Sequence, residues 1–290
     1  MTRGPAADRA LAERRLAADA GAQVPPPPGV TVSDVVLNGV PAISVRPDDV
    51  AGGDRTLLWF HGGGYRLGSA RGFAGWNCRL AAACGCEVVS VDYRLAPERP
   101  YPEALLDAVL AYTALLGPER GLIVGGESAG GGLAAALLLA AADRGLPQPL
   151  AAVLCSPWLD LRNKAQSFVD NAGRDELFPR ESADQAAALY LGGHPASDPY
   201  VSPLLGTWPA DTPRILVQAS RDESLRDDAV AFGAAVPTAR IQLFDGVPHV
   251  WQLGYPDAPR SVEAVEEIAR FVDEVAPPAA VATAGEGASR

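Results

Sequence analysis

The sequence predicts an α/β fold with a mainly parallel central sheet and helices on both faces. Short runs rich in Val, Ile and Leu alternate along the chain with longer helical patterns rich in Ala and Leu. The 290 residues are 48% hydrophobic and 20% charged, which suits one large domain with a sizeable core. Connections long enough to hold a helix join most of the runs, and such crossovers join parallel strands.

The elements follow one another after an amphipathic stretch at about 6–21 and a run of prolines at 25–28. Strands are expected where Val, Ile and Leu gather between turn residues, near 31–37, 40–46, 56–60, 87–91, 121–125, 150–155, 214–219 and 240–244. Helices are expected near 72–84, 102–116, 129–143, 181–191, 224–234 and 259–274. In this architecture ligands bind at the carboxyl ends of the strands.

One connection is longer than a simple crossover needs. More than 50 residues separate the strand that ends at Cys155 from the strand that begins at Arg214. We expect this connection to contain a lid. The end of the chain, 277–290, is rich in Ala, Gly and Pro, and we expect it to be disordered.

The charge balance argues against several classes of partner. With 24 basic and 35 acidic residues the formal net charge is -11, which opposes binding to nucleic acid and to anionic membrane surfaces. The uncharged run at 129–142 is too short to span a bilayer. The first residues lack the apolar stretch of a secretion signal, so a cytoplasmic location is expected.

The cysteines do not form a metal-binding pattern. Cys78, Cys84, Cys86 and Cys155 lie on apolar segments, and the spacing of Cys84 and Cys86 is not the C-x-x-C of zinc sites. We interpret all four as reduced structural thiols and expect no metal.

A G-x-S-x-G pattern at 126–130 provides the candidate nucleophile, Ser128. It lies directly after an expected strand and directly before an expected helix, so the serine would stand on a tight strand-to-helix turn. Glycines flank that turn because it leaves no room for side chains. Five residues alone also fit a structural turn, but this position between strand and helix favours a nucleophile.

A second glycine-rich segment, 61–65, reads His-Gly-Gly-Gly-Tyr and follows the strand expected at 56–60. A loop without side chains presents backbone N–H donors to a carbonyl oxygen. Gly63 and Gly64 would form an oxyanion hole with the N–H group of Ala129, at the helix N-terminus. A phosphate-binding loop is disfavoured because no Lys follows the glycines and the G-x-G-x-x-G spacing is absent.

A serine nucleophile needs a base, and the chain has three histidines. His61 belongs to the glycine-rich segment and His194 lies in the long connection. His249 follows the last expected strand, at the same edge of the sheet as Ser128. We therefore expect His249 to be the base.

The acid that orients His249 is expected after the strand at 214–219. Asp222 is the carboxylate nearest the end of that strand, and we assign it this role. Glu223, Asp227 and Asp228 are interpreted as charges that complement the N-terminus of the following helix.

Aromatic residues are candidates for the lining of a substrate pocket. At such spacings they are more often ordinary core, and the sequence leaves both interpretations open. The candidates are Tyr65, Trp158, Phe178, Tyr190 and Trp251, and also Trp76 and the aliphatic Leu177.

Taken together, these motifs resemble the hormone-sensitive-lipase-like family of bacterial esterases, nearest to its branch of monoterpene lactone hydrolases and acetyl-hydrolases. The likeness covers about residues 30–272. Two departures are Glu127, where many relatives carry Asp or Thr, and a turn before the acid that lacks the usual glycine. The segments that carry the resemblance are 61–65, 92–98, 126–130, 197–204 and those around Asp222 and His249.

The resemblance implies an α/β-hydrolase fold with eight strands and a small helical cap. The cap would combine residues 1–28 with an insertion at about 162–200, over a catalytic domain at 29–276. In the segment 92–98, Asp92 and Arg94 would pair with each other or bond to backbone, and so support the His61 loop.

The resemblance also implies hydrolysis of small to medium, short-chain carboxylic esters through a Ser-His-Asp triad and an acyl-enzyme, without a cofactor. A lactone hydrolase and an N- or O-deacetylase are alternatives, because they pass through the same tetrahedral intermediate. A non-catalytic small-molecule receptor on the same scaffold is a third. An exposed final strand would allow a homodimer, although nothing in the sequence requires one.

Overall fold

The computed structural model describes residues 5–23, 25–50, 55–117, 121–254 and 256–277, so the expected disordered tail at 277–290 lies, except for its first residue, outside the described part. The described residues form one eight-stranded sheet in the order β1-β2-β4-β3-β5-β6-β7-β8. Its strands are β1 (Val30–Leu37), β2 (Val40–Pro47), β3 (Arg55–Phe60), β4 (Glu87–Val91), β5 (Gly121–Glu127), β6 (Ala151–Cys155), β7 (Arg214–Ser220) and β8 (Ala239–Phe244).

The sheet is parallel except at one side. β2 runs antiparallel to both of its neighbours, β1 and β4, whereas all pairs from β4 to β8 are parallel. The prediction of a mainly parallel sheet is confirmed, and each expected strand lies within two residues of the observed one. β8 is an edge strand. A homodimer through this edge stays a prediction.

The helices expected between strands are also present. α5 was not expected, because a single turn is too short to show a helical period. The helices are α1 (Pro5–Ala18), α2 (Ala74–Cys84), α3 (Glu103–Leu115), α4 (Ala129–Asp143), α5 (Ser167–Asp170), α6 (Arg180–Leu191), α7 (Arg226–Ala235) and α8 (Pro259–Val275), with short 3-10 turns at Ala20–Gln23 and Pro203–Leu205.

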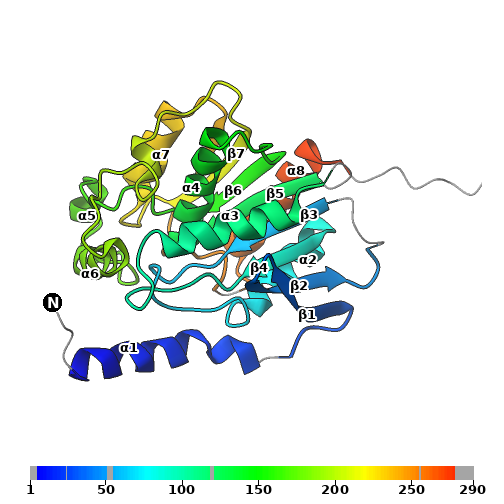
Figure 1. The fold of residues 1–290 in the computed structure, drawn as a ribbon, viewed down its shortest axis with the longest axis horizontal. Coiled ribbons are helices and arrows are strands. Elements are labelled where there is room, and N and C mark those ends of the chain that lie inside the picture. Colours follow the sequence, from blue (N-terminus) through cyan, green and yellow to red (C-terminus); the bar gives the residue numbers. More distant parts are fainter. Residues whose placement is uncertain (1–4, 24, 51–54, 118–120, 255, 278–290) are drawn as a thin grey trace, which may run out of the picture.

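Helices cover both faces of the sheet (Figure 1). α2 and α8 pack on one face, and α3, α4 and α7 pack on the other. β3 shows why both faces are apolar, because side chains alternate along a strand. Leu57 and Trp59 belong to the core beneath α2 and α8, whereas Leu58 and Phe60 belong to the core beneath α3 and α4.

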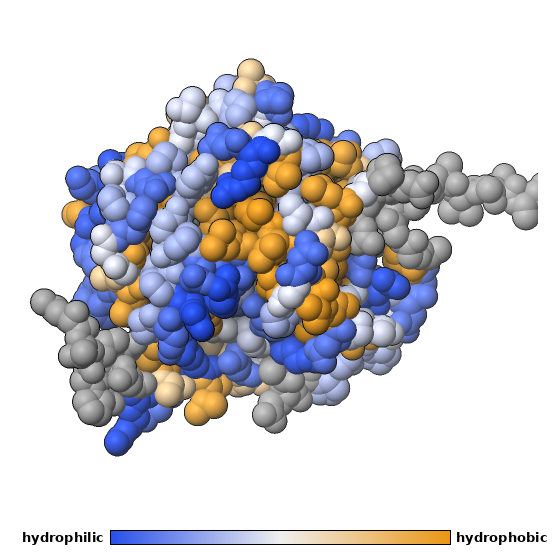
Figure 2. Space-filling model, viewed as in Figure 1, coloured by the Kyte–Doolittle hydropathy of each residue, from blue (hydrophilic) through white to orange (hydrophobic). Residues whose placement is uncertain are grey.

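The surface mixes hydrophilic and apolar side chains. Figure 2 shows apolar side chains over the face that α3 covers, where Leu106 and Leu110 are partly exposed. The four cysteines are buried and form no disulfide. Within the described part of the chain, no helix combines the length and the apolar character needed to cross a membrane.

Candidate active site

Ser128 stands on the turn between β5 and α4, at the carboxyl edge of the sheet. Its backbone has φ 54° and ψ -119°, a conformation that L residues rarely adopt. The Ser128 N–H donates to the Cys155 carbonyl at 2.9 Å, and the Ser128 carbonyl accepts from Trp158 at 3.0 Å. A side chain at Gly130 would overlap the Phe60 carbonyl oxygen, so only glycine lets the helix start this close to β3.

His249 lies within hydrogen-bond distance of the serine. The loop after β8 brings His249 Nε2 to 2.9 Å from Ser128 Oγ. The imidazole stacks on Phe178, with ring centroids 5.4 Å apart, and its side chain is almost fully buried. The 2.9 Å between His249 Nε2 and Ser128 Oγ is a separation at which a general base can take the hydroxyl proton.

The carboxylate that bonds to His249 is Glu223 and not Asp222, the residue that the sequence assigns to this role. Glu223 Oε2 lies 2.7 Å from His249 Nδ1, and the Glu223 side chain is fully buried. Asp222 instead accepts from the Gly246 N–H at 3.0 Å and pairs with Arg174 at 3.4 Å.

The local backbone explains this difference of one residue. β7 extends to Ser220, and the Ser220 N–H donates to Glu223 Oε1 at 2.9 Å, which closes a turn. The turn directs Asp222 outward and Glu223 back toward the strand ends. Asp228, which we interpreted as a helix N-terminal charge, is also buried, and it accepts from the N–H groups of Leu159 and Asp160.

Two opposing effects set the pKa of His249. Burial disfavours the charged imidazolium and lowers the pKa, while the hydrogen bond and the charge of Glu223 raise it. The second effect outweighs the first, so the pKa of His249 lies above its ordinary value of 6.5. The Glu223 carboxylate therefore makes the imidazole a stronger base.

The glycine loop after β3 lies beside Ser128. Gly62, Gly63 and Gly64 line the same cavity as the serine. Gly64 has φ 61°, in the left-handed region that favours glycine. Ala129 follows the serine as the first residue of α4. The three proposed N–H donors thus belong to segments that meet at Ser128, and an oxyanion hole formed by them stays a prediction.

Glu127 connects the serine turn to this glycine loop, a role that the sequence analysis missed. Its Oε1 accepts from the Gly62 N–H and its Oε2 accepts from Trp59 Nε1, both at 2.5 Å. Burial raises the pKa of Glu127 to about 8, although these two hydrogen bonds act in the opposite direction. The available signal was the pairing of β3 with β5, which brings the two strand ends together.

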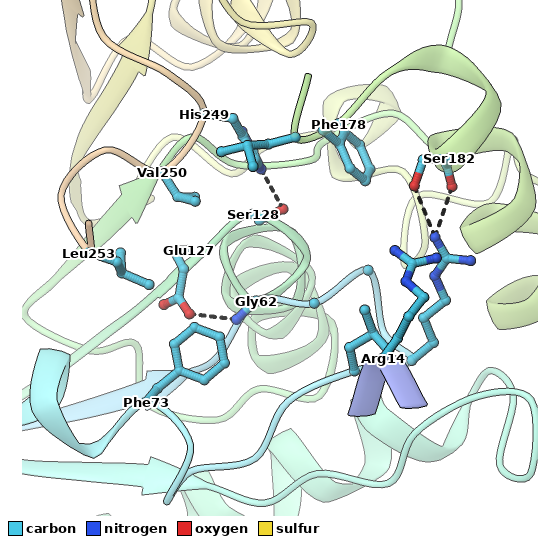
Figure 3. Close-up of a pocket in the computed structure, with 15 residues that line it drawn as sticks. Arg14, Gly62, Phe73, Glu127, Ser128, Phe178, Ser182, His249, Val250 and Leu253 are labelled. Atoms are coloured by element: carbon cyan, nitrogen blue, oxygen red, sulfur yellow. Dashed lines mark hydrogen bonds between the residues drawn. The ribbon is translucent and has the colours of Figure 1, made fainter. Parts of the chain in front are cut away.

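A cavity of about 200 Å³ opens over Ser128 (Figure 3). Glu127, Phe73 and Leu253 lie on one side of Ser128, and Arg14 and Ser182 lie on the other. Its lining consists of Arg14, Gly62, Gly63, Gly64, Arg66, Leu67, Phe73, Glu127, Ser128, Leu177, Phe178, Ser182, His249, Val250 and Leu253.

Of the five aromatic residues expected in the pocket, only Phe178 lines it. Tyr65 and Tyr190 are buried and stack on each other at 3.8 Å. Trp158 packs against the edge of Phe178 at 5.0 Å, and Trp251 packs against the ring of Phe244. These four residues are core, as large aromatic side chains usually are.

Two further polar residues of the lining come from helices. The hydrophobic periodicity of the sequence does not indicate that these helices reach the site. Arg14 belongs to α1, and Ser182 belongs to α6. Leu177, another candidate from the sequence, lies just before α6 and lines the cavity. Both segments expected to form a cap thus reach the pocket, but the cap boundaries at 1–28 and 162–200 stay a prediction.

In the segment 92–98, Asp92 and Arg94 do not pair with each other but bond to other groups. Asp92 accepts from the Ala70 N–H at 2.6 Å, beyond the glycine loop. Arg94 pairs with Asp107 rather than Asp92, with Nη2 and Oδ1 2.6 Å apart. The bonding of Asp92 to backbone is thus confirmed, and its pairing with Arg94 is not.

Comparison with known proteins agrees with this geometry. A family model described as an alpha/beta hydrolase fold matches residues 57–253. An acetyl-hydrolase of Streptomyces hygroscopicus is 37% identical, over 89% of this chain and 88% of its own. An esterase of Acinetobacter venetianus is 32% identical, over 85% of this chain and 83% of its own.

A solved structure extends the likeness to the whole fold. The crystal structure of an esterase from the bacterial hormone-sensitive lipase family has a TM-score of 0.86, with 35% identity, and covers 95% of this chain and 99% of its own. The similarity therefore extends over nearly the whole of both chains. The chain belongs to the alpha/beta hydrolase fold family and, within it, to the bacterial hormone-sensitive lipase esterases.

Proposed function

We propose that this protein hydrolyses small carboxylic esters with Ser128 as nucleophile, His249 as base and Glu223 as the acid that orients His249. One observation carries the proposal: a continuous hydrogen-bonded line joins the three side chains. Ser128 Oγ lies 2.9 Å from His249 Nε2, and His249 Nδ1 lies 2.7 Å from Glu223 Oε2. Carboxylic ester hydrolysis is also the activity named for its esterase relatives.

The reaction proceeds in two halves. Ser128 Oγ attacks the ester carbonyl carbon while its proton passes to His249 Nε2, and Glu223 stabilises the imidazolium. The negative charge on the former carbonyl oxygen is held by the N–H groups of Gly63, Gly64 and Ala129. The C–O bond then breaks, the alcohol leaves with the proton from His249, and Ser128 retains the acyl group. Water repeats the sequence and releases the acid.

The size of the cavity supports a preference for short substrates. Its volume of about 200 Å³ is below the roughly 300–1,000 Å³ that is usual for small-molecule sites. Phe178 and Leu177 form apolar lining near Ser128. Short acyl chains fit such a space, whereas long ones would extend beyond it.

The test is hydrolysis of p-nitrophenyl esters from acetate to palmitate, with the wild type beside Ser128→Ala. We expect activity that is highest on the shortest chains. The variant should lose nearly all of it, because only the background from binding and the oxyanion hole remains. Normal turnover by Ser128→Ala would overturn the assignment of the nucleophile.

Hydrolysis of an acetyl group from nitrogen or oxygen is a second candidate. The observation in its favour is that two relatives, at 37% and 34% identity, are named acetyl-hydrolase and putative acetyl-hydrolase. An acetamide passes through the same tetrahedral intermediate but has a poorer leaving group. Comparing p-nitrophenyl acetate, p-nitroacetanilide and a small lactone separates esterase, deacetylase and lactonase activity.

A further inference from the structure

Two arginines line the cavity over Ser128, and they come from different segments. Arg14 belongs to α1 and is exposed, whereas Arg66 follows the glycine loop and is only 4% exposed. Arg66 Nη2 donates to the Ser182 carbonyl at 3.2 Å and to its hydroxyl at 3.0 Å. The Arg66 guanidinium is therefore held against α6, at the margin of the site.

Both arginines also line a second hollow that adjoins the first. This hollow lies between α1 and α6. Because Arg14 and Arg66 are common to the two linings, they lie where the cavities meet. A substrate that reaches from Ser128 into the second hollow must pass both guanidinium groups. The other residues that line the second hollow are Ala10, Leu11, Gln185, Ala188 and Leu189.

The neighbouring residue Arg15 fixes the position of Arg14. Arg15 Nε donates to the Arg66 carbonyl and Arg15 Nη2 to the Ala96 carbonyl, both at 2.9 Å. Its guanidinium also pairs with Glu98 at 2.7 Å. Adjacent helical residues point about 100° apart. Because Arg15 is bound to the Arg66 and Ala96 carbonyls, Arg14 is directed at the cavity.

The cavity is thus unequal in charge on the two sides of Ser128. On the side of Phe73 and Leu253 the polar group is Glu127, and burial raises its pKa to about 8, which favours its neutral form. Arg14 and Ser182 lie on the opposite side (Figure 3). Among the described residues, Arg14 forms no salt bridge, which leaves its N–H donors available to a ligand.

We propose that the substrate is an ester that carries a carboxylate on the part remote from its reacting carbonyl, and that Arg14, with Arg66 beside it, binds this carboxylate. A guanidinium matches a carboxylate through two parallel hydrogen bonds, and such charge-assisted bonds are stronger than neutral ones. The proposal rests on the ester hydrolysis proposed above and adds the class of ester. A neutral ester would leave Arg14 without a partner.

The experiment compares each anionic ester with its neutral counterpart. 4-Acetoxybenzoate carries its carboxylate on the leaving alcohol, and its methyl ester is the neutral counterpart. Monomethyl adipate carries its carboxylate on the acyl group, and dimethyl adipate is the neutral counterpart. The readout is the ratio of kcat/KM for the anionic ester to that for the neutral one. Arg14→Gln should lower this ratio about fivefold to tenfold in at least one pair.

Two further variants separate contact from general charge. Arg9→Gln removes the same charge from the same helix at a residue outside both linings, and it should leave the ratio unchanged. Arg14→Lys should keep part of the ratio, because the charge remains without the fork of donors. Equal ratios for the wild type and Arg14→Gln in both ester pairs would overturn the proposal, as would an equal loss in Arg9→Gln.

Binding without turnover distinguishes this proposal from the proposed chemistry. Calorimetry on Ser128→Ala should show tighter binding of 4-acetoxybenzoate than of its methyl ester, and Arg14→Gln added to that variant should remove the difference. This result does not depend on which residue is the nucleophile. Equal affinities for the two esters would contradict the carboxylate site even if Ser128 proves to be catalytic.

Discussion

Glu127 is hydrogen-bonded to the backbone of Gly62, with Oε1 2.5 Å from the amide nitrogen. The residue before the proposed nucleophile thus holds the first glycine of the loop that we propose for oxyanion binding. Through its other oxygen the same carboxyl group accepts from Trp59, in β3. This buried side chain therefore helps to set the separation between the serine and the proposed oxyanion donors.

Glu127→Gln should lower kcat about tenfold and change KM little, because an amide supplies only one acceptor oxygen for two N–H donors. The displaced loop would weaken binding of the transition state more than binding of the substrate. Steady-state kinetics on p-nitrophenyl acetate measure the effect, and the urea midpoint checks that the variant is folded. An unchanged kcat in a folded variant would show that Glu127 does not position the loop.

The pH profile gives Glu127 a second signature. Since the pKa of Glu127 is about 8, its carboxyl becomes charged above that pH, beside the place where the oxyanion develops. We expect kcat/KM of the wild type to fall above about pH 8 and expect no such fall from this cause in Glu127→Gln. The same alkaline fall in both proteins would assign it to another group.

Replacement of Glu223 distinguishes the two candidate acids. The imidazole must be neutral to act as a base, so kcat/KM should fall as the pH drops through the pKa of His249, which lies above 6.5. Glu223→Gln removes the charge that raises this pKa, so the acid limb should move to lower pH while kcat falls about 10²- to 10⁴-fold.

Asp222→Asn is the matched control for that experiment. Asp222 bonds to Gly246 and Arg174 rather than to His249, so its replacement should leave the acid limb in place. A large loss of kcat in Asp222→Asn, with little in Glu223→Gln, would restore the assignment made from the sequence.

Stability should fall as the pH rises, because burial raises the pKa of Asp228 from 3.8 to about 8. Between these values the folded state binds a proton that the unfolded state lacks, so the free energy of unfolding decreases by about 1.4 kcal/mol per pH unit for this group. Asp228→Asn keeps the acceptor for Leu159 and Asp160 but cannot ionise.

Urea unfolding at pH 5.5, 6.5 and 7.5 measures this dependence. The slope of the variant should be less negative by about 1.4 kcal/mol per pH unit. Glu127 and His249 have raised pKa values as well, so a decline of the same sign remains in the variant. Asp245→Asn, which alters a largely exposed carboxylate, serves as the control. Equal slopes for the wild type and Asp228→Asn would refute the assignment.

The layered fold was predictable because each of its strands is a short aliphatic run between turn residues. The proposed nucleophile and base were predictable for a similar reason, since Ser128 directly follows β5 and His249 lies in the loop after β8. The choice of Glu223 over Asp222 was not predictable, because it depends on how the turn at 220–223 closes. Neither were Arg14 and Ser182, because only the packing of α1 and α6 brings them to the cavity.

The attachment of α1 has a consequence for how tightly ligands bind. In its part from residue 9 to residue 18 only Leu11 is buried, and hydrogen bonds made by Arg15 attach this part to the neighbouring loops. Local unfolding of such a helix exposes little apolar surface, so it costs far less free energy than unfolding of the sheet. A ligand held by Arg14 binds only to molecules in which α1 is docked on the rest of the protein. Its apparent affinity is therefore reduced by the fraction of molecules in which the helix is detached.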